Sequence, residues 1–236
     1  MEAEKDQQDE FKDKEMLTKI VKLCSRELPS YQSQLKTAAE ILRAGGVVAL
    51  PTDTIYGLST TIPYVSKLYE IKGRSEAKPV ALCVSDISQL YQCCTVTVPQ
   101  SLLSDLLPGA VTLLFHRSPS LPASFNPGTS LVGLRIPHSP FICQLCSTLN
   151  QPLALTSANV SQQLSSLAIE EFRSLWPSLD LIVDEGPITD NEANRAGSTV
   201  VDLSTPGKYR IVRNGCALHV TEKLLRSSKY GLIKQL

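Results

Sequence analysis

The amino-acid sequence predicts a single α/β or α+β domain built on a twisted sheet of parallel and antiparallel strands with helices around it. Short apolar runs of strand length alternate with longer segments in which apolar residues recur at helical spacing. We find no internal repeat and no clean linker within this alternation. The composition, 42% hydrophobic and 19% charged over 236 residues, is that of an ordinary globular domain.

The first elements have the clearest patterns. Segment 34–46 places Leu35, Ala38 and Leu42 on one helical stripe and stops at Gly45, and a short buried strand follows at 47–50. Further strands are expected at 79–84, 110–117, 131–137, 153–156 and 179–186, and further helices at 64–72, 141–149, 168–176 and 221–227. Segments 197–203 and 209–213 should form a last antiparallel pair across a Pro-Gly turn.

The chain ends differ in composition from this domain. We expect a flexible, charged arm over 1–30, the domain over 31–229 and a short tail over 230–236. The first 16 residues are acidic and contain no arginine, unlike signal or transit peptides, so the cytoplasm is the expected compartment, with a mitochondrial pool left open. No segment approaches the roughly 20 apolar residues of a membrane span. The seven cysteines lack paired metal-ligand spacing, so reduced thiols and no bound metal are expected.

Polar clusters follow several of the predicted strands. They read "PTDTIYGL" after 47–50, "TSAN" after 153–155, "RIP" at the end of 131–137 and "GST" before the last strand pair. In open α/β sheets ligands bind at strand ends, so these distant clusters could line one cavity. The alternative is ordinary turn and capping chemistry, which uses the same residue types.

Two cations stand out by their position. Arg135 lies in the otherwise apolar "LVGLRIP", where a buried guanidinium would suit a bound carboxylate or phosphate. The alternatives are an internal salt bridge or an outward-facing position at a sheet edge. Lys72 continues the apolar face of segment 64–72, although a helix-end lysine with a free amine has the same pattern. With Arg74 and Lys78, Lys72 makes a local cationic cluster in a chain of zero net charge, so any phosphate binding must be local.

Sequence signatures of several enzyme classes are missing. The chain contains no P-loop, GxGxxG or GxSxG motif, and its three histidines are scattered without triad or metal spacing. Any chemistry should therefore depend on positioning and charge neutralisation and not on a nucleophile.

Taken together, the motifs resemble the YrdC-like family of threonylcarbamoyl-AMP synthases. The resemblance covers about 34 to 229 and is carried, in order, by "PTDTIYGL", "KGRSEAKP", "LPGAVTLLF", "LRIP", "TSAN", "GSTVVDL" and "VRNG". "KGRSEAKP" and "QPLALTSAN" are most similar to animal members. The family fold implied is a twisted mixed sheet with a large concave pocket.

The resemblance also implies a reaction and a site. L-Threonine, bicarbonate and ATP would give threonylcarbamoyl-AMP and pyrophosphate with Mg²⁺ assisting, and a separate transferase complex would use the product to modify the adenosine next to the tRNA anticodon. Lys72 and Arg74 would be catalytic, although whether Lys72 neutralises charge or moves a proton stays open. The implied ATP contacts are Arg74, Lys78, Leu155, Ser157, Asn159, Ser165 and Arg213, and the implied threonine contacts are Thr52, Thr54, Cys83, Arg135 and Ser198.

Two further expectations concern function. The alternative to the synthase is a non-catalytic RNA-binding or regulatory module of the same fold. The neutral net charge and the lack of aromatic residues among the cations count against it, so tRNA binding would be weak.

Many family members carry a second, C-terminal domain that we do not expect here. The polar, glycine-bounded loop 185–197 is therefore the candidate for closing the pocket.

Overall fold

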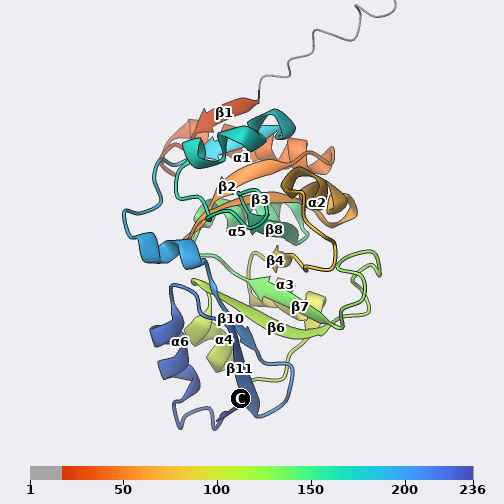
Figure 1. The fold of residues 1–236 in the computed structure, drawn as a ribbon, viewed down its shortest axis with the longest axis vertical. Coiled ribbons are helices and arrows are strands. Elements are labelled where there is room, and N and C mark those ends of the chain that lie inside the picture. Colours follow the sequence, from red (N-terminus) through yellow and green to blue (C-terminus); the bar gives the residue numbers. More distant parts are fainter. Residues whose placement is uncertain (1–17, 236) are drawn as a thin grey trace, which may run out of the picture.

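One large mixed sheet organises residues 18–235, the part of the chain that the computed structural model describes (Figure 1). Its strands are β1 (Lys19–Lys22), β2 (Val48–Pro51), β3 (Tyr56–Thr61), β4 (Ala81–Cys83), β5 (Cys94–Thr95), β6 (Val111–Arg117), β7 (Leu131–Arg135), β8 (Leu153–Ser157), β9 (Leu181–Asp184), β10 (Thr199–Asp202), β11 (Lys208–Arg213) and β12 (Ile233–Lys234). The spatial order is β1-β9-β2-β3-β8-β4-β7-β6-β10-β11-β12, with β5 beside β6. Strand β4 pairs parallel with β7 and antiparallel with β8, so the expected mixed sheet is confirmed.

Helices pack on both faces of the sheet. They are α1 (Pro29–Arg43), α2 (Ser66–Lys72), α3 (Ile87–Cys93), α4 (Gln100–Leu106), α5 (Pro140–Leu149) and α6 (Leu218–Leu225), with 3₁₀ segments η1 (Ile62–Tyr64), η2 (Ile169–Ser178) and η3 (Glu192–Ala196). Helices α1 and α5 share one core with alternate residues of β2, β8 and β9. The intervening strand residues point to the other face, where α2, α3, α4 and η2 complete a second core.

Part of the face that carries α1 and α5 forms an open floor. The core under these two helices takes its strand residues from β2, β4, β8 and β9, and does not extend to β6, β7 or β10. Beyond that core, the same face carries a small or polar residue on each of three strands, Ala81 on β4, Gly133 on β7 and Thr112 on β6. Their neighbours in the sheet are Leu155, Leu114 and Val200, respectively. A Cβ at Gly133 would lie 3.1 Å from Thr112 Cγ2, so a side chain there would fill this space. The floor is therefore available to a ligand.

Several elements differ from the sequence-based expectations. Strand β3 was not expected, because its "STT" segment is polar. Its hydroxyls are nevertheless buried, since Ser59 Oγ donates to Ala154 O at 3.0 Å and Thr60 Oγ1 donates to Gly46 O at 2.9 Å. The expected helix 168–176 is instead the 3₁₀ segment η2, whose backbone leaves helical geometry at Phe172. Helix α4 was also not expected.

The expected arm and tail are partly ordered. Residues 1–17 of the arm lie outside the described residues, but β1 pairs in parallel with β9 over four residues, and α1 begins at Pro29. The tail forms β12, which pairs with β11. Both strands are short and mostly exposed, so backbone hydrogen bonds hold them and no apolar pattern marks them. Over residues 18–235, no helix is long and apolar enough to cross a membrane.

Candidate active site

A cavity of about 220 Å³ lies over the open floor of the sheet, and we call it the main cavity. Its walls come from the segments after β2, α2 and β8 and from the segments around β10 and β11. Four polar strand ends far apart in the sequence thus meet at one place, as the polar clusters predicted. The expected site residues that line it are Thr52, Arg74, Arg135, Leu155, Ser157, Ser165, Ser198 and Arg213.

Three guanidinium groups line the main cavity, and no carboxylate does so among the described residues. Burial lowers the pKa of Arg74, and the pKa of Arg213 is lowered by burial first and then by the charges of Arg135 and Arg74. The Nε atoms of Arg74 and Arg135 are buried without a hydrogen-bond partner. Because unpaired cationic donors are costly to bury, this arrangement favours a bound polyanion.

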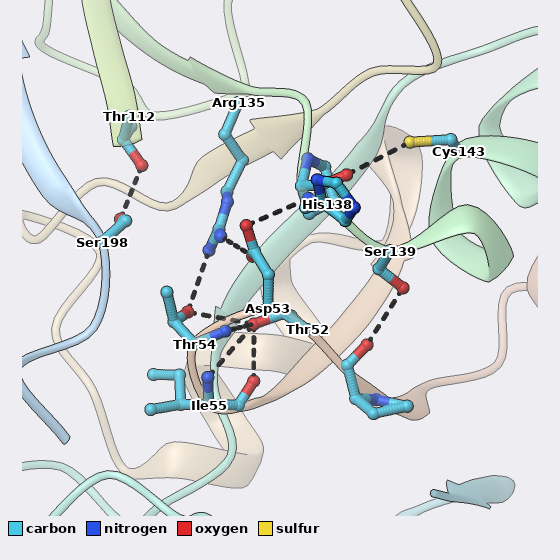
Figure 2. Close-up of polar contacts among 12 residues, drawn as sticks. Thr52, Asp53, Thr54, Ile55, Thr112, Arg135, His138, Ser139, Cys143 and Ser198 are labelled. Atoms are coloured by element: carbon cyan, nitrogen blue, oxygen red, sulfur yellow. Dashed lines mark hydrogen bonds and ion pairs between the residues drawn. The ribbon is translucent and has the colours of Figure 1, made fainter. Parts of the chain in front are cut away.

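Arg135 has an internal partner as well (Figure 2). Its Nη2 donates to Asp53 Oδ1, its Nη1 lies 3.4 Å from Thr54 Oγ1, and Asp53 Oδ2 accepts the backbone N–H of His138 at 3.0 Å. The internal salt bridge, one of the alternatives for Arg135, is therefore present, and Arg135 also faces the cavity, so that anion binding by it stays a prediction. Asp53 was missed by the sequence reasoning, although it lies inside "PTDTIYGL" between two residues that were chosen.

The loop after β2 is organised by a hydroxyl group. Thr52 Oγ1 donates to Ile55 O at 2.7 Å and accepts the backbone N–H groups of Thr54 and Ile55 at 3.1 and 3.2 Å. The two threonine hydroxyls are 3.0 Å apart (Figure 2). This local turn holds Asp53 next to Arg135. The hydroxyl of Thr52 therefore stabilises a turn, as the alternative predicted, while Thr52 also lines the cavity.

Ser198 and Arg213 come together through a close backbone contact. Arg213 donates from Nε and Nη2 to Ser198 O at 3.0 and 2.8 Å, and the hydroxyls of Ser198 and Thr112 are 2.8 Å apart (Figure 2). A Cβ at Gly215 would lie 2.2 Å from the Ser198 carbonyl carbon, which explains the glycine of "VRNG". The β10–β11 register shifts by one residue next to the Val200–Arg213 pair, which places Arg213 on the floor side. Thr112 was not predicted from the sequence.

Lys72 lies behind the cavity wall, with 2% of its surface exposed. Its Nζ donates to the backbone carbonyls of Ser157 and Asn159, and lies 3.4 Å from Ser157 Oγ and 3.3 Å from Asn159 Oδ1. Burial, with a smaller effect of Arg74, lowers the pKa of Lys72 to about 7. The lysine therefore shapes the "TSAN" turn whose serine lines the cavity.

The remaining expected site residues do not line the main cavity. Lys78 is exposed in the turn after α2, and Thr54 is buried beneath Arg135. The Asn159 side-chain amide donates to Val160 O and Gln163 O, at 2.9 and 2.8 Å, within its own turn. Cys83 pairs with Arg135 across β4 and β7 but is covered by α5, and burial raises its pKa to about 12. Direct substrate contacts by these four residues stay predictions.

Fold and cavity together define a class of protein: a mixed-sheet α/β domain with a cationic ligand cavity on one sheet face. Residues 40–215 match the model of the Sua5, YciO and YrdC family, described as telomere recombination. The chain therefore belongs to the Sua5/YciO/YrdC family.

Several curated relatives are similar in sequence to this chain over most of its length. A protein of Rattus norvegicus named threonylcarbamoyl-AMP synthase is 50% identical over 221 residues, which are 92% of this chain and 79% of the rat protein. A Homo sapiens protein of the same name is 50% identical over 218 residues, which cover 90% and 78% of the two chains. The crystal structure of Pyrococcus abyssi Sua5 complexed with L-threonine matches with a TM-score of 0.78 and 25% identity, over 92% of this chain and 63% of that one.

Proposed function

We propose that this protein is a threonylcarbamoyl-AMP synthase, an enzyme that transfers the adenylyl group of ATP to threonine-derived carbamate. Threonine and bicarbonate form the carbamate with loss of water. A carbamate oxygen then attacks the α-phosphorus of ATP as the bond to pyrophosphate breaks. Because the product is an activated adenylate, we further propose that it passes to a tRNA threonylcarbamoyl transferase complex.

The observation that carries the proposal is the cationic main cavity in a chain 50% identical to proteins of that name. A triphosphate brings several negative charges, and the cavity offers three guanidiniums with no lining carboxylate over the described residues. We assign Arg74 and Arg213 to phosphate oxygens, with Ser157 and Ser165 as hydrogen-bond partners of the nucleotide. Lys78, at the exposed end of the same basic motif, can approach the phosphates only from outside.

The threonine end of the site is proposed around Arg135. A guanidinium fork suits a carboxylate, and Asp53 holds Arg135 by one nitrogen while its Nε stays unpartnered. Thr52 and Ser198 line the same cavity, and their hydroxyls can bind the threonine hydroxyl and amine. Bringing the three reactants together supplies much of the rate acceleration, since no nucleophile is needed.

Mg²⁺ fits this site only as a partner of ATP. No group of three His, Cys, Asp or Glu side chains within residues 18–235 could hold a metal ion. The phosphates and water would therefore supply the ligands of Mg²⁺, as is common for nucleotide enzymes, and the cation would neutralise phosphate charge.

Lys72 is proposed to act through the turn it holds. Its amine already has four oxygen neighbours from Ser157 and Asn159, so it sets the position of the serine hydroxyl in the wall. A pKa of about 7 also lets it exchange a proton near neutral pH. Direct proton transfer from the threonine amine to Lys72 would require the Lys72 amine to leave at least one of those four oxygens.

Pyrophosphate release from ATP tests the proposal. We expect release by the full chain to require L-threonine, bicarbonate and Mg²⁺ together, and threonylcarbamoyl-AMP to appear in equal amount by mass spectrometry. Release that continues without threonine or without bicarbonate would contradict the synthase. Salt-sensitive tRNA binding without ATP turnover would instead favour the RNA-binding alternative.

A further inference from the structure

A second cavity, of about 300 Å³, adjoins the main cavity, and Thr52 lines both. Its other walls are the segment 23–26 before α1, the start of α5 and the residue after β9. No motif of the family resemblance accounts for the 23–26 wall, and the proposed reaction uses only Thr52, the residue that both cavities share. We call it the second cavity.

An unpartnered phenol lines the second cavity. Tyr31 of α1 is 2% exposed, and its ring meets Phe141 of α5 edge to face with centroids 5.5 Å apart. Its hydroxyl is buried and its proton has no acceptor, because the neighbouring Arg26 side chain can only donate a hydrogen bond. Leaving such a group unsatisfied is unfavourable, so a ligand that accepts its proton would relieve the cost.

Opposite charges also line the second cavity. Arg26 and Glu185 both belong to its walls. Both act on the Tyr31 hydroxyl. Its pKa is raised by burial first, lowered by the charge of Arg26 and by a hydrogen bond with that side chain, and raised by the charge of Glu185. The His138 ring and the hydroxyls of Ser25 and Ser139 complete the polar lining. One cation and one carboxylate in a small space suit a ligand that carries both charges.

We propose that the second cavity binds a free α-amino acid in its zwitterionic form. The carboxylate accepts from the Arg26 guanidinium and the Tyr31 hydroxyl, and the ammonium group faces Glu185. Charge-assisted hydrogen bonds at both ends select this class over simple anions or amines. The inference rests on the proposed function only in its choice of probe, because L-threonine is the amino acid which that reaction consumes.

Isothermal titration of the full chain with L-threonine in the absence of ATP tests this site. Besides binding in the main cavity, we expect a second binding event that Tyr31→Phe and Glu185→Gln each weaken about tenfold, the effect of losing about 1.4 kcal/mol. The exposed matched variants Tyr91→Phe and Glu40→Gln should leave it unchanged. Two probes with a single charge separate the two ends of the site. N-acetyl-L-threonine lacks the ammonium group, so Glu185→Gln should not change its binding. L-Threonine methyl ester lacks the carboxylate, so Tyr31→Phe should change its binding least.

The stability of Tyr31→Phe provides a second readout. This change removes an unpartnered hydroxyl, so the urea midpoint should stay equal or rise while L-threonine binding falls. A lower midpoint with unchanged titration would overturn the proposal, as would threonine binding that neither Tyr31→Phe nor Glu185→Gln alters.

Pyrophosphate release separates this inference from the proposed function. If release fails to depend on threonine while Tyr31→Phe still removes a binding event, the second site stands and the synthase proposal fails. If release depends on threonine but no titration event responds to the two variants, the synthase stands and the second site is wrong.

Discussion

The two cavities share Thr52 yet differ in charge. The main cavity has three guanidiniums and, over residues 18–235, no lining carboxylate, whereas the second cavity sets Arg26 against Glu185. Because an unbalanced cationic wall favours a polyanion and a balanced one favours a zwitterion, the loop that carries Thr52 would separate the two proposed ligands. Asp53 is the carboxylate nearest to this contrast, because it forms an ion pair with Arg135 but does not itself line the main cavity.

The strongest test of this comparison removes Arg135. We expect Arg135→Ala to lower the free energy of unfolding by about 3 kcal/mol, because it leaves the carboxylate of Asp53 buried and uncompensated. Urea unfolding measures this loss. Asp53→Ala in the same background should restore part of it, whereas additive losses in the double variant would show that the ion pair does not couple the two residues.

Replacing Arg74 tests the main cavity without leaving a buried carboxylate uncompensated. Arg74→Ala should reduce the rate of pyrophosphate release more than tenfold, equivalent to about 1.4 kcal/mol or more, with an unchanged unfolding midpoint. The exposed Arg43 of α1 provides the matched control, since Arg43→Ala removes the same charge away from both cavities. A normal rate in a stable Arg74→Ala protein would refute the phosphate assignment.

A third test is the pH dependence of stability from Lys72. Its pKa falls from 10.5 in the unfolded chain to about 7 in the fold, so the folded form binds fewer protons between these values. The Lys72 contribution to stability is therefore greatest above pH 10.5 and is lost as the pH falls to about 7. Urea unfolding across this window should show a steeper rise for the wild type than for Lys72→Met.

The exposed matched variant Lys67→Met should keep the wild-type slope, since Lys67 lies on the same helix but outside the main cavity. Equal slopes for Lys72→Met and the wild type would mean that Lys72 keeps an ordinary pKa in the fold. Its amine would then serve only to hold the carbonyls of Ser157 and Asn159.

Sequence patterns predicted most elements because helical and strand periodicities are local. The stripe of α1, the antiparallel pair β10–β11 and the position of Arg135 in an apolar strand all followed from neighbouring residues. Strand β3 was missed since its hydroxyls are satisfied by carbonyls of Gly46 and Ala154, which are distant in sequence. The polar strand ends were correctly expected to meet, and most of the residues chosen from them line the main cavity.

By itself, the sequence determined that the chain forms a mixed α/β sheet and that Arg135 lies within an otherwise apolar strand. Only the tertiary structure decided that the partner of this guanidinium is Asp53, that Lys72 faces the carbonyls of the "TSAN" turn, and that α5 covers Cys83. The physical reason is that periodicity and capping depend on adjacent residues, whereas a salt bridge, a buried amine and an unpartnered phenol depend on which distant segments pack together.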